Sequence, residues 1–139
     1  MLDACVVLKW FLLDEPYKEK ADILKQDMMS EKVKLFAPSF MLQEVTNSLW
    51  KAIKLKRITK EDATEALKNL DDLPINFYEF NWAEASDELA IVSKLDLAVY
   101  DVAYLFLSEK MNAKLITSDD KMYQKAKLNF KLLHLKDYM

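Results

Sequence analysis

Glycine is absent from this chain of 139 residues, although average usage would supply roughly ten. P-loops that bind phosphate, GxGxxG fingerprints that bind dinucleotides and GxSxG nucleophile elbows all require glycine at fixed positions. The absence of glycine therefore excludes these three kinds of site.

Cysteine and histidine occur once each, as Cys5 and His134. A zinc site of the Cys/His type needs more ligands than these two residues supply. A Ser-His-Asp triad could use only His134, and the apolar segment FKLLHL around it is more simply interpreted as a strand near the C-terminus. A single cysteine cannot form an internal disulfide, which favours a reducing, cytoplasmic location.

Long hydrophobic runs are also missing, so we expect no membrane-spanning segment. The apolar start CVVLKWFLL is interrupted by Lys9 and is not followed by a small-residue cleavage site, so we expect no signal peptide. The net charge of -3 argues against a chain that binds nucleic acid through a generally basic surface. An acidic site that first recruits metal ions remains compatible with this charge.

The apolar pattern predicts strands that alternate with helices. Strands are expected at 2–8, 33–37, 75–80, 114–117 and 130–135. Helices are expected at 16–30, 38–56, 82–95, 99–111 and 119–127, with a further one that opens at Thr59 and ends before Pro74. This alternation is typical of an α/β fold with a mainly parallel sheet. No linker or repeat interrupts the chain, so we expect one domain over residues 1–139.

Three local signals refine this prediction. Pro38 is suited to the first position of a helix. Thr59, with Asp62 three residues later, resembles a capping box in which Asp replaces the usual Glu. Asn112 stands where a glycine would usually end a helix, because Asn tolerates the left-handed conformation.

Asp101 is the only ionisable residue, tyrosines aside, in the run LAVYDVAYLFL. A lone carboxylate in such a run is costly to bury without a partner. It falls near the start of an expected helix, where the helix dipole favours an anion. Two interpretations weigh equally: Asp101 caps this helix, or it binds a cation.

Three other acids favour the cation. Asp3 follows the first apolar residues, Asp119 follows the strand KLIT, and Glu44 lies two turns into the helix after the second strand. Ligands of open parallel sheets bind beyond the carboxyl ends of the strands. Four carboxylates that converge there would repel one another unless a hard cation such as Mg²⁺ or Mn²⁺ neutralised them.

Each of these three acids also has an ordinary structural interpretation. Asp119 could cap the helix after it, and Asp120 is its rival for a functional role. Asp3 could be an exposed terminal residue. Glu44 falls opposite the apolar stripe of its helix, as a solvated residue would. That stripe is expected to consist of Leu42, Val45, Leu49 and Ile53.

Taken in order, these motifs resemble PIN domains of the VapC toxin type. The pattern is an acid after the first strand, a helical E-x-x-N, a YD at a helix start and a T-x-D after a strand. The matching segments are LDACVVLKWFLLDE, LFAPSFMLQEVTNSLWKAI and LDLAVYDVAYLFLSEKMNAKLITSDDKMYQKA, which together span nearly the whole chain. The resemblance implies a three-layer, PIN-like α/β fold with a parallel central sheet of about five strands and helices on both faces.

The resemblance also implies a function: a Mg²⁺- or Mn²⁺-dependent endoribonuclease, the toxin of a type II toxin–antitoxin pair, usually a homodimer and neutralised by a cognate antitoxin. A metal-activated water would hydrolyse the RNA phosphodiester and leave a 5′-phosphate. Thr117 matches a hydroxyl near the metal, and Asn47 could orient the helical glutamate or touch the substrate. The catalytic and metal-binding acids of the family correspond to Asp3, Glu44, Asp101 and Asp119.

The chain departs from the family pattern in two places. Only Met1 and Leu2 precede Asp3, where the family has several apolar residues. Asp96 and Asn112 stand where the family commonly has glycine. These differences bear on the length of the first strand and on loop geometry.

Two other kinds of protein share some of these features. A response-regulator receiver domain needs paired acids soon after its first strand, and Asp14 and Glu15 come too late for this. A PIN fold that serves only as a protein-binding or RNA-binding module stays open. Lysines could hold an RNA backbone near the site, although each is more simply interpreted as a solvated surface residue. They are Lys9, Lys51 and Lys121.

Overall fold

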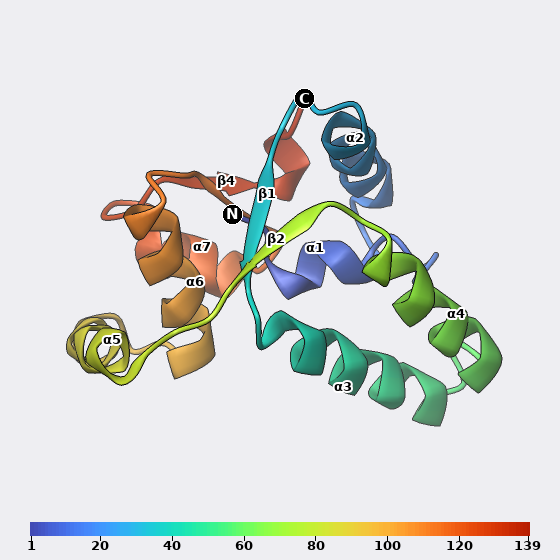
Figure 1. Ribbon diagram of the computed structural model, residues 1–139, viewed down its shortest axis with the longest axis horizontal. Helices are drawn as coiled ribbons and strands as arrows, with labels where there is room; N and C mark the ends of the chain where they lie inside the picture. The colour runs from blue at the N-terminus through green and yellow to red at the C-terminus, as the bar shows by residue number, and fades with distance from the viewer.

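The computed structural model describes residues 1–139 and contains seven α-helices, four short strands and a final 3-10 helix. The helices are α1 (Ala4–Leu8), α2 (Lys18–Met29), α3 (Met41–Lys54), α4 (Lys60–Asp71), α5 (Trp82–Leu95), α6 (Val99–Lys110) and α7 (Asp120–Ala126). The others are β1 (Leu35–Pro38), β2 (Ile75–Tyr78), β3 (Leu115–Thr117), β4 (Leu132–His134) and η1 (Leu135–Asp137). The strands lie between α1–α4 on one side and α5–α7 on the other (Figure 1).

The first residues join two pairs of parallel strands. β1 pairs with β2, and β3 pairs with β4. Between the pairs, the Leu2 amide donates to the Phe36 carbonyl at 2.8 Å, and the Ile116 amide donates to the Met1 carbonyl at 3.0 Å. The spatial order is therefore β2, β1, residues 1–3, β3, β4, which agrees with the expected five-stranded arrangement. The first strand is reduced to a single bridge between Leu2 and Ile116.

The expected strand over residues 2–8 is wrong, because most of this segment is helix α1. Asp3 caps the helix: its carboxylate accepts a hydrogen bond from the Cys5 amide at 3.3 Å. A short apolar run suits a buried helix as well as a strand, and its periodicity does not separate the two. The Asp3 cap therefore favours a helix over a strand in this segment.

Pro38 ends β1, so the prediction that it opens the next helix is wrong. It pairs with Tyr78 in the parallel register, and the Ser39 amide donates to the Tyr78 carbonyl at 2.8 Å. A proline is tolerated at the end of a strand because its missing N–H costs little there. Helix α3 consequently begins three residues later, at Met41.

The buried face of α3 differs from the expected stripe by one position at each end, since Met41 and Ala52 are buried where Leu42 and Ile53 were expected. Leu42 is 50% exposed and Met41 is buried instead. This change rotates the buried face toward Glu44, which is half-buried at its margin. The expectation that Glu44 lies on the opposite, solvated side is therefore wrong. The buried residues of α3 are Met41, Val45, Leu49 and Ala52.

The helix ends foreseen at Thr59, Asp96 and Asn112 are observed, but only half of the capping box is present, because the Asp62 carboxylate accepts no hydrogen bond from the Thr59 amide. The Thr59 hydroxyl accepts a hydrogen bond from the Asp62 amide at 3.1 Å and so caps α4. Asp96 and Asn112 have φ angles of 51° and 48°. Asp and Asn are the residues other than glycine that adopt this left-handed conformation most readily, so the chain turns at both helix ends without glycine.

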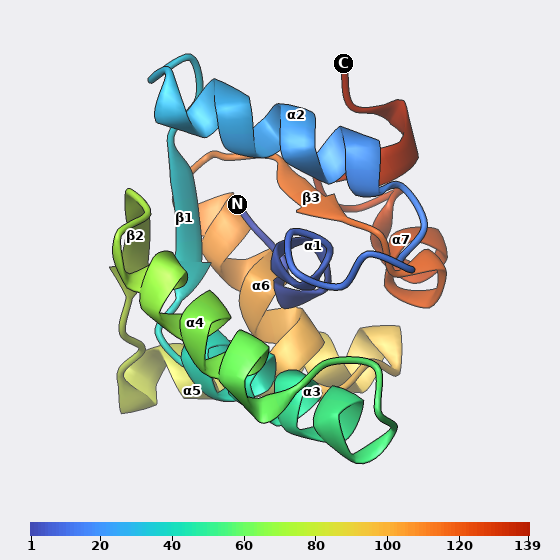
Figure 2. The ribbon, with the colours of Figure 1, turned by 90° about the vertical axis from the view of Figure 1, so that its right-hand side faces the viewer.

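Helix α6 contributes several residues to the hydrophobic core, which explains why its sequence is so apolar. Six of the seven residues from 102 to 108 are buried, and the seventh, Phe106, is partly buried. Figure 2 shows α6 behind the sheet, with α1 in front of it. None of the helices combines the length and the hydrophobicity needed to cross a lipid bilayer.

Helix α5 contains two buried glutamates, Glu84 and Glu88. Glu84 accepts hydrogen bonds from the Tyr78 hydroxyl at 2.8 Å and the Asn81 amide group at 2.7 Å. Lys110 lies 3.3 Å from the same oxygen. Glu84 Oε2 and Glu88 Oε1 are buried without a hydrogen-bond partner. Burial, and then the charge of Glu84, raises the pKa of Glu88.

We expect Glu88→Gln to stabilise the fold by about 1 kcal/mol at pH 8, because the change removes a poorly paired buried charge. The pKa of Glu88 is raised on folding. The wild-type protein therefore loses stability as the pH rises above the usual pKa of a glutamate, and the variant does not. The advantage should vanish at pH 4. Urea denaturation at both pH values measures it, with Asp87→Asn as the exposed control on the same helix. A Glu88→Gln protein that is less stable at pH 8 would contradict this account.

Candidate active site

The four acids singled out in the sequence all lie at the starts of helices. Asp3 caps α1 and Asp119 caps α7, while Glu44 and Asp101 lie in the first turns of α3 and α6. They come from four distant segments, yet their charges act on one another. Asp3 and Asp119 raise the pKa of Asp101, and Asp3 and Asp101 raise that of Glu44. We call these four residues the acid cluster.

Asp3 is the most buried member of the acid cluster, at 8% exposure. Its carboxylate accepts hydrogen bonds from the Thr117 hydroxyl at 2.6 Å and from the Cys5 amide. Burial raises the pKa of Asp3, the two hydrogen bonds oppose this effect, and the charge of Asp119 adds to it. The alternative of an exposed terminal residue is therefore wrong.

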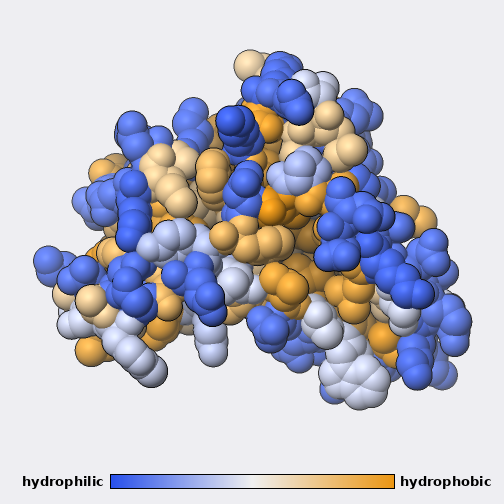
Figure 3. Space-filling model, in the orientation of Figure 1, coloured by the Kyte–Doolittle hydropathy of each residue, from blue (hydrophilic) through white to orange (hydrophobic).

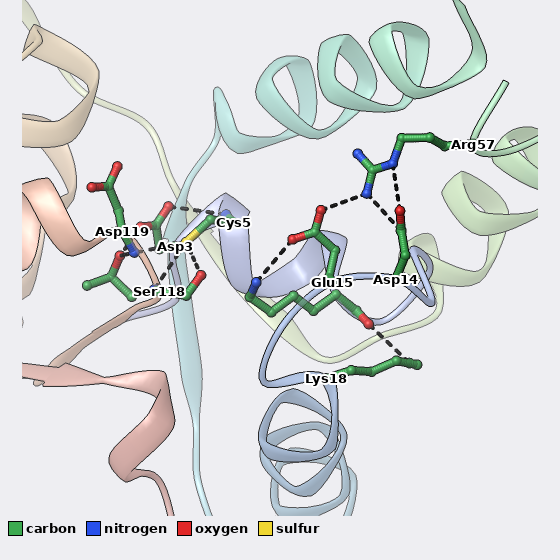
Figure 4. A network of polar contacts seen from close by, with 10 residues as sticks. Asp3, Cys5, Asp14, Glu15, Lys18, Arg57, Ser118 and Asp119 are labelled. Carbon is green, nitrogen blue, oxygen red and sulfur yellow. Dashed lines mark hydrogen bonds and ion pairs between the residues drawn. The ribbon is translucent and has the colours of Figure 1, made fainter. Parts of the chain in front are cut away.

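Thr117 links two members of the acid cluster. It is fully buried at the end of β3, where its hydroxyl donates to Asp3 and accepts from the Asp119 amide at 3.0 Å. Asp119 Oδ1 accepts from the Met122 amide at 2.9 Å, so the capping role foreseen for Asp119 is confirmed. Figure 4 shows Asp3 and Asp119 close together near the start of α1.

Cys5 lies beside this pair and is not a reactive thiol. Its sulfur contacts the Ser118 hydroxyl at 3.2 Å and the Ser118 amide at 3.3 Å. Burial, followed by the charge of Asp3, raises the pKa of the Cys5 thiol well above its usual range. A thiol held in its protonated form is a poor nucleophile, so carboxylates carry the reactive chemistry that this edge can offer.

Asp101 is a half-buried acid without a capping role. The N-cap position of α6 belongs to Ala98, and no side-chain hydrogen bond caps the helix. The interpretation of Asp101 as an N-cap is therefore wrong. Burial, followed by the charges of Asp3 and Asp119, raises its pKa to about 6, and Lys121 acts in the opposite direction. Asp101 is thus left available for a cation.

Glu44, in the first turn of α3, is the fourth member of the acid cluster. Its Oε2 accepts a hydrogen bond of 2.5 Å from the hydroxyl of Tyr104. Burial raises the pKa of Glu44, and the charges of Asp3 and Asp101 raise it further. The sequence did not predict Tyr104 as a residue of the site, although its position three residues after Asp101 places both on one face of α6.

Other residues considered in the sequence lie differently. Asn47 is exposed, and its part in orienting Glu44 or touching a substrate stays a prediction. Asp120 turns toward β4, where its carboxylate lies 3.1 Å from His134 Nε2. His134 is a buried strand residue, as expected.

The lysines divide into two kinds. Lys9 is 3% exposed and its ammonium pairs with Glu15 at 3.2 Å, so its interpretation as a solvated surface lysine is wrong. Lys51 and Lys121 are exposed. Of these, Lys121 lies close enough to Asp101 to lower its pKa.

Arg57 holds the remaining acids of the N-terminal loop. Its guanidinium donates to both oxygens of Asp14, at 3.1 and 2.8 Å, and to Glu15 at 2.9 Å. Figure 4 shows this network at the far end of α1 from Asp3. Asp14 and Glu15 are therefore ion-paired and lie outside the acid cluster, so they do not supply a receiver-type acid pair.

The donors at the acid cluster fit a hard divalent cation in their chemistry. They are four carboxylates and the Thr117 hydroxyl, all oxygen ligands of the kind that Mg²⁺ and Mn²⁺ prefer. In this structure no three of the acidic, histidine or cysteine side chains lie close enough together to hold a metal ion. Binding an ion therefore requires these side chains to draw closer, which its charge would favour by cancelling their repulsion.

Comparisons with known proteins agree on one family. The family model of the PIN domain matches residues 1–128. A curated relative from Pyrobaculum aerophilum, named Ribonuclease VapC3, is 32% identical over 83 residues. This alignment covers 59% of the chain and 63% of the relative, which is less than two thirds of the relative's length.

A solved structure shares the fold. The crystal structure of PAE2754 from Pyrobaculum aerophilum superimposes with a TM-score of 0.71 at 21% sequence identity. The match covers 97% of this chain and 89% of that one. At this level of identity the similarity supports the fold, and the chemistry must be argued from the acid cluster.

Proposed function

Because this chain belongs to the PIN domain family, we propose that it is a metal-dependent endoribonuclease and the toxin of a type II toxin–antitoxin pair. The name of the curated relative, Ribonuclease VapC3, supports the proposal. The observation that carries it is the acid cluster itself. Burial and the charges of neighbouring members of the cluster raise the pKa values of Asp3, Glu44 and Asp101, and a purely structural role would not require four carboxylates at one edge.

In this proposal Asp3, Asp101 and Asp119 hold Mg²⁺ or Mn²⁺, with Glu44 as the fourth ligand. The bound ion would supply Lewis-acid activation of a water and stabilise charge on the leaving oxygen. Thr117 fixes the Asp3 carboxylate through its 2.6 Å hydrogen bond. Lys121, exposed beside Asp101, is placed to meet a phosphate of the RNA backbone.

The experiment that tests the proposal is cleavage of total RNA with sequencing of the new ends. We expect cleavage with Mg²⁺ or Mn²⁺, none after EDTA treatment, and 5′-phosphate ends from direct attack by water. Attack by the 2′-hydroxyl would leave a cyclic phosphate instead and would contradict the mechanism. RNA binding without cleavage would favour the alternative, a PIN fold that serves as a binding module only.

Two exposed apolar surfaces are suited to bind the protein partners that this function requires, a second copy of the chain and an antitoxin. On α5, Trp82 is 92% and Leu89 is 66% exposed, and this uncharged face suits a homodimer contact. A groove of about 480 Å³ between α3, α4 and β2 suits a hydrophobic segment of the antitoxin. Figure 3 shows hydrophobic side chains along the middle of the face that Figure 1 presents. The apolar lining of the groove is Met41, Leu42, Val45, Leu67, Leu70, Leu73, Ile75 and Phe77.

The location follows from the substrate. Cellular RNA as the target, together with a cysteine that needs no disulfide partner, leads us to propose that the protein acts in the cytoplasm.

A further inference from the structure

We propose that Tyr104 is a positioning residue of the acid cluster: its hydroxyl holds Glu44 against the repulsion of Asp3 and Asp101. The inference rests on the proposed function, since it concerns how this chain keeps its fourth acid ready for a cation. It assigns to Tyr104 a role in orientation and no contact with the substrate.

The first observation is the hydrogen bond between two distant segments. Tyr104 lies in α6 and Glu44 in α3, 60 residues apart, and the hydroxyl donates to Glu44 Oε2 at 2.5 Å. Because one oxygen is engaged in this way, Oε1 remains free for a ligand. A hydrogen bond to a charged acceptor is stronger than one between neutral groups, so it can fix the carboxylate.

The second observation is that the phenol itself is held firmly. Tyr104 is 1% exposed, and the ring of Phe40 packs edge-on against it with centroids 5.6 Å apart. The hydroxyl is therefore held in a rigid setting and links two elements of the site, α3 and α6.

The third observation concerns charge. A tyrosine hydroxyl is protonated at neutral pH, so at this separation it donates to the Glu44 carboxylate. Asp3 and Asp101 repel Glu44. Glu44 is a flexible, half-buried side chain at the margin of its helix, so repulsion would turn it toward solvent if nothing held it. The Tyr104 hydroxyl is the group that opposes this movement.

The test is Mn²⁺ titration calorimetry of Tyr104→Phe, which removes only the hydroxyl. Residues that orient metal ligands typically contribute 10- to 100-fold to affinity, so we expect Mn²⁺ binding to weaken by about 10-fold. In a Glu44→Gln background the same change should have little further effect, because the group that Tyr104 holds is already altered. RNA cleavage should lose kcat while KM stays near its wild-type value.

The chain offers a matched control in Tyr138. This buried tyrosine follows η1, and its hydroxyl donates to the Asp27 carboxylate of α2 at 2.7 Å. Tyr138→Phe should lower thermal stability to a similar extent and leave Mn²⁺ affinity unchanged. Equal weakening by both tyrosine variants would mean general loosening of the fold and would overturn the proposal.

The remaining outcomes are also decisive. Wild-type affinity in Tyr104→Phe would overturn the positioning role alone and leave the proposed function standing. Mn²⁺ binding without RNA cleavage by the wild-type protein would overturn the proposed function, while the affinity of Tyr104→Phe would still decide the positioning role. A wild-type protein that binds no Mn²⁺ would overturn both. A Tyr104→Phe protein that fails to fold would overturn the positioning role, because the hydroxyl would then serve the fold.

Discussion

Replacing Asp101 with asparagine is expected to reduce metal-dependent RNA cleavage by more than about 100-fold, since even residues behind the ligands contribute 10- to 100-fold. Asparagine keeps the size of the side chain and removes the charge that a divalent cation requires. The fold should remain intact. Asp101 does not cap its helix, and burial, followed by the charges of Asp3 and Asp119, already disfavours its ionised form.

Cleavage rates and thermal unfolding of the purified variant measure the two halves of this prediction. Glu109→Gln is the matched control, because Glu109 is an exposed acid in the last turn of the same helix. It should cleave RNA at the wild-type rate. If Asp101→Asn cleaves RNA normally, the assignment of the acid cluster is wrong. If it unfolds, Asp101 has a structural role that the contacts of the structure do not explain.

Saturating Mn²⁺ is expected to stabilise the protein strongly at pH 7.5 and much less at pH 5. A ligand present at a hundred times its dissociation constant contributes about 2.7 kcal/mol. For a domain of this size that corresponds to a rise in the melting temperature of roughly 5–10 °C. The physical reason is that the ion cancels the mutual repulsion of the acid cluster.

The pH dependence follows from Asp101. Its pKa is raised from 3.8 to about 6 in the folded protein. Without metal, the unfolded chain releases this proton first, so the fold loses stability as the pH rises through this window. A metal ligand must be charged, so below about pH 6 the ion has to displace the proton and binds more weakly. The stabilisation by Mn²⁺ therefore grows as the pH rises from 5 to 7.5.

Thermal unfolding with Mn²⁺ or EDTA at the two pH values checks this prediction. Asp101→Asn should lose most of the shift in melting temperature and most of its dependence on pH. An equal shift at pH 5 and pH 7.5 would show that no carboxyl with a raised pKa takes part in binding. A shift that survives in Asp101→Asn would place the ion elsewhere.

The sequence by itself determined the features that depend on neighbouring residues. Helix α5 was predicted at its observed bounds, and Thr59, Asp96 and Asn112 shape helix ends as foreseen. Caps, helical periodicity and left-handed turns involve groups only a few positions apart, so their energetics can be read locally. The order of the four acids along the chain likewise indicated the family.

Only the tertiary structure decided how distant segments meet. In the folded chain residues 4–8 form a helix where a strand was expected. Glu44 lies at the margin of the buried face of α3, and Lys9 is buried and paired with Glu15. It also brought the Tyr104 hydroxyl to Glu44 across 60 residues. Burial and hydrogen bonds between remote side chains depend on how whole elements pack. No local pattern records them, and they determine which carboxylates stay available for a cation.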